Sequence, residues 1–278
     1  MSQKSEADAL IIRRHIIKML ELAGSGHAGG ALGIADILAV LYREILRHDP
    51  QNPTWENRDR FVLSNGHTCP ALYATLALHN YFPKDELWQL RQINSFLEGH
   101  PHENVEKGIE LSSGPLGQGL SQMLGMSLAG RLKQLDNHFF ALLSDGEHQE
   151  GQTWEAYQFG AKYKLANATV IIDRNYIQIS GVTEQIMPLD PFADKIRSFG
   201  WQVYEVNGHD HQAIYQTIRE AMADEQPSAI IAYTTPGKGV DFIEAKFTWH
   251  GDAPDPQQAR TALRQLNSLA GKLDTQYD

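Results

Sequence analysis

The stretch Phe139-Phe140-Ala141-Leu142-Leu143-Ser144-Asp145-Gly146-Glu147 joins an apolar run of strand length to a polar turn. A second junction of this kind, Ile172-Asp173-Arg174-Asn175-Tyr176-Ile177, follows the apolar run over residues 169–173. The two junctions place an acid and an amide where predicted strands end. Because ligand sites of open α/β sheets lie outside the carboxyl ends of the strands, we expect both junctions at one edge of one sheet.

The rest of the chain repeats this alternation of strand-like and helical patterns. Further strand-length runs cover residues 60–64, 202–206 and 229–233. Helical spacing of apolar residues predicts helices over residues 5–23, 34–46, 70–79, 119–132, 154–164 and 212–223. Strands that alternate with helices predict an α/β fold with a mainly parallel sheet covered by helices on both faces.

At 278 residues, of which 42% are hydrophobic, the chain could form one large α/β domain or two small ones, and no internal repeat or domain linker is evident. We expect residues 1–278 to form a single domain with a polar C-terminal extension over 252–278, including a helix over 257–273. The net charge of −10 argues against nonspecific binding of nucleic acid. No apolar run approaches the roughly 20 residues that span a bilayer. The single cysteine, Cys69, fits a reducing compartment, so a cytoplasmic protein is expected.

Asp145 and Asn175 are candidate metal ligands. Carboxylate and amide oxygens, with a nearby backbone carbonyl, are hard ligands that suit Mg²⁺ or Ca²⁺ better than zinc. An ordinary turn at Asp145 and a helix cap at Asn175 are the alternative interpretation. Since both halves flank a strand–helix–strand unit, we favour an anchor for a metal ion and a diphosphate.

The loop Gly114-Pro115-Leu116-Gly117-Gln118-Gly119 precedes a predicted helix. Its glycines let the backbone approach a ligand closely, and the first amides of a helix favour anions. A tight turn with close helix packing is the alternative. The Lys-Ser/Thr pair of a nucleotide P-loop is missing from this position.

Four histidines stand beside glycine in predicted loops: His27, His67, His100 and His250. We expect them to share a cleft as hydrogen-bond donors to substrate oxygens and as proton-transfer groups. No HExxH or Cys/His spacing accompanies them, so zinc is not expected. Arg174 and Lys238 are interpreted as partners in loop salt bridges, without a catalytic role.

Taken together, these motifs resemble those of the thiamine diphosphate enzymes, specifically the amino-terminal half of transketolase. The resemblance runs from Gly24-Ser25-Gly26-His27 to Trp249-His250-Gly251. Its most specific parts are Ser64-Asn65-Gly66-His67, Gly99-His100-Pro101, the 114–119 loop, Asp145-Gly146 with Glu150-Gly151, and Asp173-Arg174-Asn175.

The resemblance implies a role for each matching position. The metal, Mg²⁺ with Ca²⁺ or Mn²⁺ as substitutes, would be held by Asp145, Asn175 and the carbonyl of Ile177. Residues implied to contact thiamine diphosphate are His67, Gly114, Pro115, Leu116, Gly146, Glu147, Asn175 and His250. Residues implied in catalysis are three histidines that would face sugar oxygens, namely His27, His100 and His250. Two acids, Glu150 and Glu155, are also implied in catalysis and would lie between the two cofactors of a dimer. The alternative for these two acids is an ordinary solvated position.

The chain departs from the family pattern in three respects. Ser144 replaces the usual first glycine of the metal motif, and we expect a small backbone adjustment with retained metal binding. The loop His27-Ala28-Gly29-Gly30 lacks the proline often found after that histidine and is more similar to the split forms. The length leaves no room for the pyrimidine-binding domain, which supplies the glutamate that activates the cofactor, or for the third domain.

We therefore expect the diphosphate-binding subunit of a split transketolase, active only with a separate C-terminal subunit in an α₂β₂ assembly. It would transfer a two-carbon ketol unit from a ketose or its phosphate to an aldose or its phosphate. The alternatives are a 1-deoxyxylulose-5-phosphate synthase-like subunit and a degenerate homologue with a binding or regulatory role.

Overall fold

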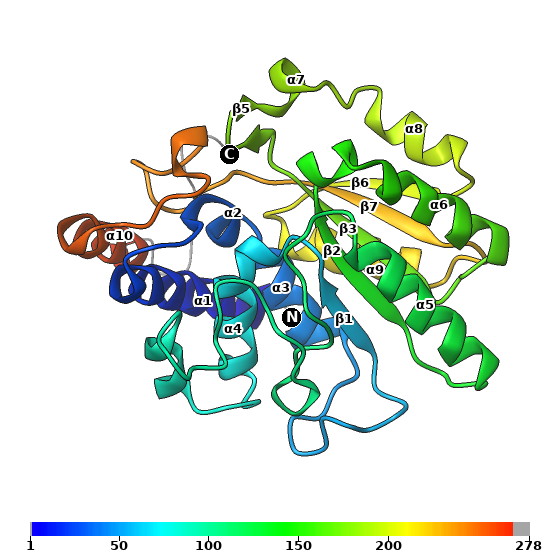
Figure 1. Ribbon diagram of the computed structural model, residues 1–278, viewed down its shortest axis with the longest axis horizontal. Coiled ribbons are helices and arrows are strands. Elements are labelled where there is room, and N and C mark those ends of the chain that lie inside the picture. The colour runs from blue at the N-terminus through cyan, green and yellow to red at the C-terminus, as the bar shows by residue number, and fades with distance from the viewer. Residues whose placement is uncertain (1, 269–278) are drawn as a thin grey trace.

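A parallel sheet of five strands lies at the centre of the computed structural model, which describes residues 2–268 (Figure 1). Neighbouring strands follow the order β1-β2-β3-β7-β6, and every pair in this sheet is parallel. The strands are β1 (Arg60–Leu63), β2 (Phe139–Ser144), β3 (Ala168–Arg174), β6 (Gln202–Asn207) and β7 (Ser228–Tyr233). The predicted α/β fold and its five strands are confirmed.

Helices cover the sheet on both sides (Figure 1). The helices are α1 (Ser2–Ala23), α2 (Ala28–Gly33), α3 (Ala35–Val40), α4 (Cys69–Leu78), α5 (Gly119–Leu132), α6 (Gly151–Tyr163), α7 (Thr183–Ile186), α8 (Phe192–Ser198), α9 (His211–Ala221) and α10 (Pro256–Ser268). A short antiparallel hairpin, β4 (Ile177–Gln178) and β5 (Gly181–Val182), stands apart from the main sheet.

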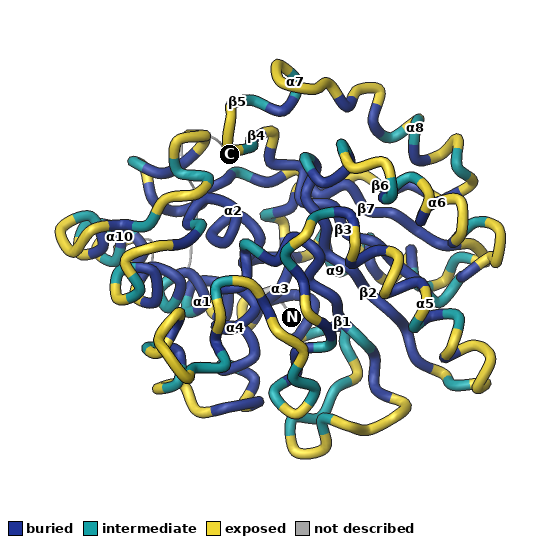
Figure 2. The backbone as a smooth tube through the Cα atoms, viewed as in Figure 1, coloured by how far each residue is buried: buried dark blue, intermediate teal, exposed yellow. Residues whose placement is uncertain are grey.

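The apolar strands are buried because each face of the sheet carries its own core. Phe140 and Leu142 belong to the core formed with α1, α3 and α4, whereas Ala141 and Leu143 belong to the core formed with α5 and α6. Successive side chains of a strand point to opposite faces, so burial of both faces requires an uninterrupted apolar run. The tube in Figure 2 accordingly shows buried strands inside exposed loops and outer helix faces.

A buried ion pair joins the helices on one face. Arg13 of α1 donates two hydrogen bonds to Asp36 of α3, at 2.9 and 2.6 Å. His209 and His211, which follow β6, bond to the same carboxylate. Burial alone would raise the pKa of Asp36, but Arg13 and the two histidines hold it well below its usual value. Asp36 is therefore an ionised carboxylate with a full set of partners.

The structure differs from the expected elements in two segments. The single helix expected over 34–46 is divided into α3 and a π-helical turn at Leu41–Ile45, and a further short helix that was not expected, α2, precedes it. The backbone of Gly33 packs closely against Thr235: a Cβ added to Gly33 would stand 3.2 Å from the Thr235 carbonyl oxygen. This close contact is next to the break between α2 and α3 at Ile34. Residues 177–198 contain β4, β5, α7 and α8, which the pattern did not predict because each is too short for a periodicity. The expected terminal helix is described to Ser268, and its remaining residues 269–273 lie outside the described part.

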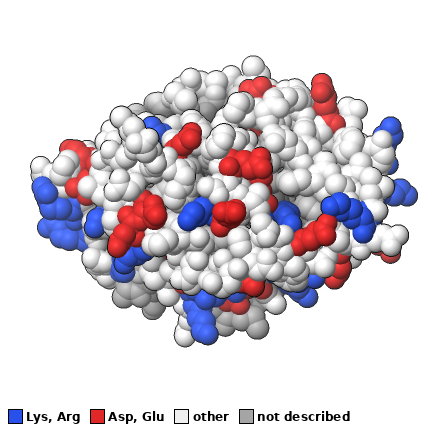
Figure 3. Space-filling view, turned by 60° about the horizontal axis from the view of Figure 1, so that its bottom comes forward, with Lys and Arg blue, Asp and Glu red and all other residues white. Residues whose placement is uncertain are grey.

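The surface carries charges of both signs. Figure 3 shows acidic and basic side chains interspersed over the face in view. A search of the described residues found no helix with the length and hydropathy needed to cross a membrane.

His138 illustrates how burial fixes the protonation of a side chain in this fold. It precedes β2, is 7% exposed, and its Nε2 lies 2.8 Å from the Thr169 hydroxyl. Burial lowers the pKa of His138 to about 3. The folded protein therefore keeps this imidazole neutral at pH values where the unfolded chain protonates it.

We predict that His138 makes the folded state sensitive to acid. Between about pH 6 and pH 4 the unfolded chain binds a proton at His138 that the folded chain does not, so the stability from the neutral ring is present above pH 6.5 and is lost as the pH falls. The slope is about 1.4 kcal/mol per pH unit. Urea unfolding measures the free energy of unfolding of wild type and of His138→Gln over this pH range. The free energy of unfolding should fall with decreasing pH more steeply in wild type, by about 1.4 kcal/mol per pH unit. Parallel profiles would contradict the prediction.

Candidate functional site

The two junctions picked out from the sequence lie side by side at the carboxyl edge of the sheet. Ser144 at the end of β2 pairs with Asp173 in β3, and the Asp145 amide donates to the Asp173 carbonyl oxygen at 3.1 Å. Asp145 then caps the turn Gly146–Gln149, accepting the Gly146 amide at 2.7 Å through Oδ1. The predicted position of both motifs is thus confirmed.

Asp145 and Asn175 are buried and hydrogen-bonded, and Asp145 accepts from both loops. Asp145 Oδ2 accepts the Tyr176 amide at 2.8 Å and Arg174 Nη1 at 3.2 Å. Asn175 Oδ1 accepts the Ile177 amide at 3.0 Å. Burial raises the pKa of Asp145 to about 6, although Arg174 and the two amides act in the opposite direction.

This donor set fits a hard divalent cation. It offers one carboxylate, one amide oxygen and the backbone of Ile177, which lines the neighbouring cavity. A search of residues 2–268 found no group of three or more His, Cys, Asp or Glu side chains able to hold a metal. A zinc-type site needs such a group, whereas Mg²⁺ is bound through one or two carboxylates together with ligand phosphates and water.

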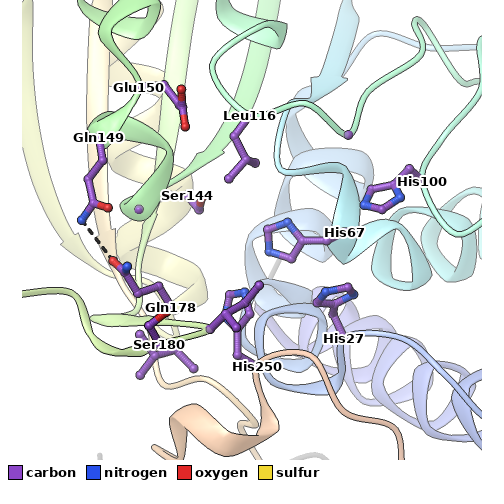
Figure 4. A pocket seen from close by; sticks show the side chains of 14 residues that line it. His27, His67, His100, Leu116, Ser144, Gln149, Glu150, Gln178, Ser180 and His250 are labelled. Atoms are coloured by element: carbon purple, nitrogen blue, oxygen red, sulfur yellow. Dashed lines mark hydrogen bonds between the residues drawn. The ribbon is translucent and has the colours of Figure 1, made fainter. Parts of the chain in front are cut away.

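A cavity of about 410 Å³ opens beside these residues (Figure 4). The four glycine-flanked histidines reach it from four separate loops, as the sequence indicated. Their ring centroids lie 5.1 Å apart for His27 and His67, 5.2 Å for His67 and His250, 5.8 Å for His27 and His250, and 6.4 Å for His27 and His100. The lining also includes Gly114, Leu116, Gly146, Glu150 and Ile177.

All four histidines are held in the neutral form. Burial, followed by the neighbouring imidazoles, lowers the pKa of His27 to about 4 and that of His67 well below its usual value. Burial also lowers the pKa of His100 and His250. The Nδ1 atoms of His27 and His250 are buried without a protein partner. Neutral imidazoles with unpaired nitrogens can exchange hydrogen bonds and protons with a polar ligand.

Glu147 holds the glycine-rich loop 114–119 in place through hydrogen bonds. This buried carboxylate accepts the Gly117 amide at 2.7 Å, the Ser64 hydroxyl and the Ser144 amide at 3.3 Å. Glu147 is fully buried behind the loop and is not among the cavity-lining residues. Burial raises its pKa to about 7.

Other candidates fall inside or outside the cavity. Glu150 lines it, whereas Glu155 lies exposed on α6 and Pro115 lies exposed at the tip of its loop, neither of them at the cavity wall. Asn175 lines an adjoining hollow of about 250 Å³. Arg174, the last residue of β3, forms buried ion pairs, as interpreted from the sequence, although it ends a strand and does not lie in a loop.

Sequence reasoning missed five residues of the cavity wall: Ser144, noted only as a departure from glycine, and Gln149, Gln178, Ile179 and Ser180. Gln149 Nε2 donates to Gln178 Oε1 at 3.0 Å, which links the turn after Asp145 to hairpin β4–β5 (Figure 4). The available signal was proximity in sequence, since all five lie within a few positions of Asp145 or Asn175.

We predict that Gly117→Ala weakens the site because Gly117 has φ of +82° and an added Cβ would stand 2.9 Å from Glu150 Cβ. The strain should cost about 1–2 kcal/mol of unfolding free energy. Gly125→Ala is the matched control, since Gly125 lies exposed inside α5 with no atom within 4 Å of an added Cβ. This control should gain about 0.5–1 kcal/mol. Urea unfolding measures both, and equal effects would contradict the strain at Gly117.

Three comparisons with known proteins bear on this site. A family model described as "Transketolase, thiamine diphosphate binding domain" matches residues 4–267. The chain is 39% identical over 259 residues to the 6-deoxy-6-sulfo-D-fructose transketolase subunit SqwG of Clostridium sp. (strain MSTE9), covering 93% of this chain and 94% of that protein. It is 38% identical over 263 residues to an apulose-4-phosphate transketolase subunit of Phocaeicola vulgatus, covering 94% of this chain and 93% of that protein.

Solved structures show the same fold. Transketolase from Campylobacter jejuni superposes with a TM-score of 0.87 at 33% identity, covering 95% of this chain and 42% of that chain. A transketolase variant from Pichia stipitis gives a TM-score of 0.88 at 30% identity, covering 97% and 41%. The chain therefore spans less than half the length of these solved proteins.

Proposed function

The chain belongs to the transketolase family, in which it matches the thiamine diphosphate-binding domain, and on that premise we propose that it is the diphosphate-binding subunit of a split transketolase. The observation that carries this proposal is the meeting of two features at one cavity. The buried pair Asp145 and Asn175 lies directly behind the part of its wall formed by Ser144, Gly146 and Ile177, and four neutral histidines line another part of it.

The residues present fit the cofactor's diphosphate and a metal ion. Asp145, Asn175 and the carbonyl of Ile177 would hold Mg²⁺, for which Ca²⁺ or Mn²⁺ can substitute. Gly114, Leu116 and Gly146 line the cavity where a diphosphate would lie. Ser113 Oγ and both polar side-chain atoms of Asn65 are buried without a partner around the same loops, which supports a polar occupant.

The chain's own part in ketol transfer is orientation and proton transfer. Thiamine diphosphate, when bound, supplies the carbon nucleophile that accepts the two-carbon unit. The neutral rings of His27, His100 and His250 can donate to and accept from sugar hydroxyls, and each can take up a proton released there. Ile177 and Ile179 place apolar side chains on the same wall and reduce the access of water.

The relatives' names support a separate partner chain. Two of them are called subunits of transketolases and are covered over 93–94% of their length, whereas the solved transketolases are covered over 41–42%. We infer that a second subunit completes the cavity and supplies the acid that activates the cofactor, in an α₂β₂ assembly. The substrates are a ketose and an aldose or their phosphates, and the protein acts in the cytoplasm.

Asp145→Ala should abolish the binding of thiamine diphosphate with Mg²⁺, because it removes the only carboxylate of the proposed ligand set. Isothermal titration with cofactor and excess Mg²⁺ measures this, with an expected loss of at least about 100-fold. Asp136→Ala is the control, since Asp136 is exposed and its salt bridge is with Arg47, away from the cavity. Retained binding in Asp145→Ala would refute the anchor.

Ketol transfer should require both subunits. The chain mixed with its partner should convert a ketose donor and an aldose acceptor, whereas either chain alone should be inactive. His100→Ala should lower kcat/KM by about 10²–10⁴-fold if the ring takes part in proton transfer. Coupled assays with a ketose, and separately with pyruvate as donor, check this. Turnover of pyruvate but not of ketoses would instead favour a 1-deoxyxylulose-5-phosphate synthase-like activity.

A further inference from the structure

Arg174 is a buried cation that connects the two motifs of the site. Its side chain is 1% exposed at the end of β3. Nη1 donates to Asp145 Oδ2 at 3.2 Å, while Nη2 donates to Glu184 at 2.7 Å and to Asp190 at 3.3 Å. The guanidinium also lies 4.1 Å from the centre of the Tyr176 ring. One side chain thus contacts the proposed metal-binding carboxylate and both ends of the segment 176–190.

The contact with Asp145 restricts the orientation of that carboxylate. Oδ2 receives Arg174 and the Tyr176 amide, whereas Oδ1 receives the Gly146 amide at 2.7 Å. Three donors from three directions leave the carboxylate little freedom to rotate. Removing Arg174 would take away one of the two donors to Oδ2 and the positive charge that balances a fully buried Asp145.

The contacts with Glu184 and Asp190 restrain the segment that carries the Ile177 carbonyl, the proposed backbone ligand of the metal. This segment begins beside Asn175 and includes Ile177, and its hairpin places Gln178, Ile179 and Ser180 on the cavity wall. Glu184 also accepts the amides of Leu189 and Asp190, so it ties the far end of the segment to Arg174. Arg174 therefore sets the spacing between the proposed metal ligand after β2, Asp145, and the proposed ligands after β3, Asn175 and Ile177.

Resting on the function proposed above, we propose that Arg174 is a positioning residue of the metal–diphosphate anchor. It orients Asp145 and holds segment 176–190 in the arrangement that binds the metal, without itself contacting the metal. Partners that orient the ligands of a metal site typically change metal affinity by 10–100-fold when they are removed.

The test measures Mn²⁺ affinity in the presence of thiamine diphosphate, from the electron paramagnetic resonance signal of free Mn²⁺. Arg174→Gln should weaken Mn²⁺ binding about 10–100-fold. The Mn²⁺ affinity of Arg174→Lys should lie between those of wild type and Arg174→Gln. Lysine keeps the positive charge, but its single nitrogen cannot bond to Asp145 and Glu184 in the two-pronged geometry of a guanidinium. Arg197→Gln is the matched control, since Arg197 lines a separate hollow of about 220 Å³ together with Arg174 and pairs with Asp194 and Glu205 but not with Asp145.

The affinity for thiamine diphosphate at excess metal distinguishes a positioning role of Arg174 from a role in the stability of the fold alone. If Arg174 positions the anchor, saturating Mn²⁺ should restore the affinity of Arg174→Gln for thiamine diphosphate towards the wild-type value. Wild-type Mn²⁺ affinity in Arg174→Gln, or a loss that excess metal does not restore, would overturn the inference. Should that variant fail to fold, Glu184→Gln, which loosens only the far end of the segment, must still weaken Mn²⁺ binding several-fold.

The two proposals fail in different ways. A wild-type chain that binds neither Mn²⁺ nor thiamine diphosphate would refute the proposed function, and the inference with it. A wild-type chain that binds both, alongside an Arg174→Gln variant that binds equally well, would refute the inference alone.

Discussion

The burial of the Asp145 carboxylate is the constraint on which the carboxyl edge of this sheet depends. A carboxylate with no solvent exposure must be compensated by hydrogen bonds and charge, and even with this compensation burial raises the pKa of Asp145 to about 6. The compensation comes from the Gly146 and Tyr176 amides and from Arg174. These donors belong to two different strands and their loops, so satisfying one carboxylate fixes the relative placement of both motifs.

Buried polar side chains also fix the parts of the site that lie further from Asp145. Glu147, two residues further on, is also buried, and it draws the glycine-rich loop and Ser64 towards the turn after β2. The four histidines approach from the opposite side with neutral rings, because burial and mutual proximity disfavour their charge. A cavity bordered on one side by the chain neighbours of Asp145 and Asn175, and on the other by neutral imidazoles, suits a metal-bound diphosphate next to a polyhydroxylated substrate.

The parts that follow from local chemistry could be predicted from the sequence. Apolar runs without alternation indicated strands buried on both faces, and an acid and an amide at two strand ends indicated the position of Asp145 and Asn175 at the sheet edge. The role of Glu147 could not be predicted in this way, because its partners Ser64 and Gly117 are distant in sequence. Hairpin β4–β5 was missed for a related reason. Its strands have two residues each, too few to show a pattern, and its contact with the turn after β2 is a bond between Gln149 and Gln178, which are distant in sequence.

Membership of the transketolase family and the geometry of the edge lead to one central claim, that Asp145, Asn175 and the Ile177 carbonyl bind the metal that anchors thiamine diphosphate. The most direct measurement is anomalous diffraction at the manganese edge from crystals grown with thiamine diphosphate and Mn²⁺. The account predicts one strong peak within coordination distance of all three groups, with the diphosphate beside it towards Gly114 and Gly146. A peak at another location, or cofactor bound in the cavity with no metal at Asp145, would contradict it.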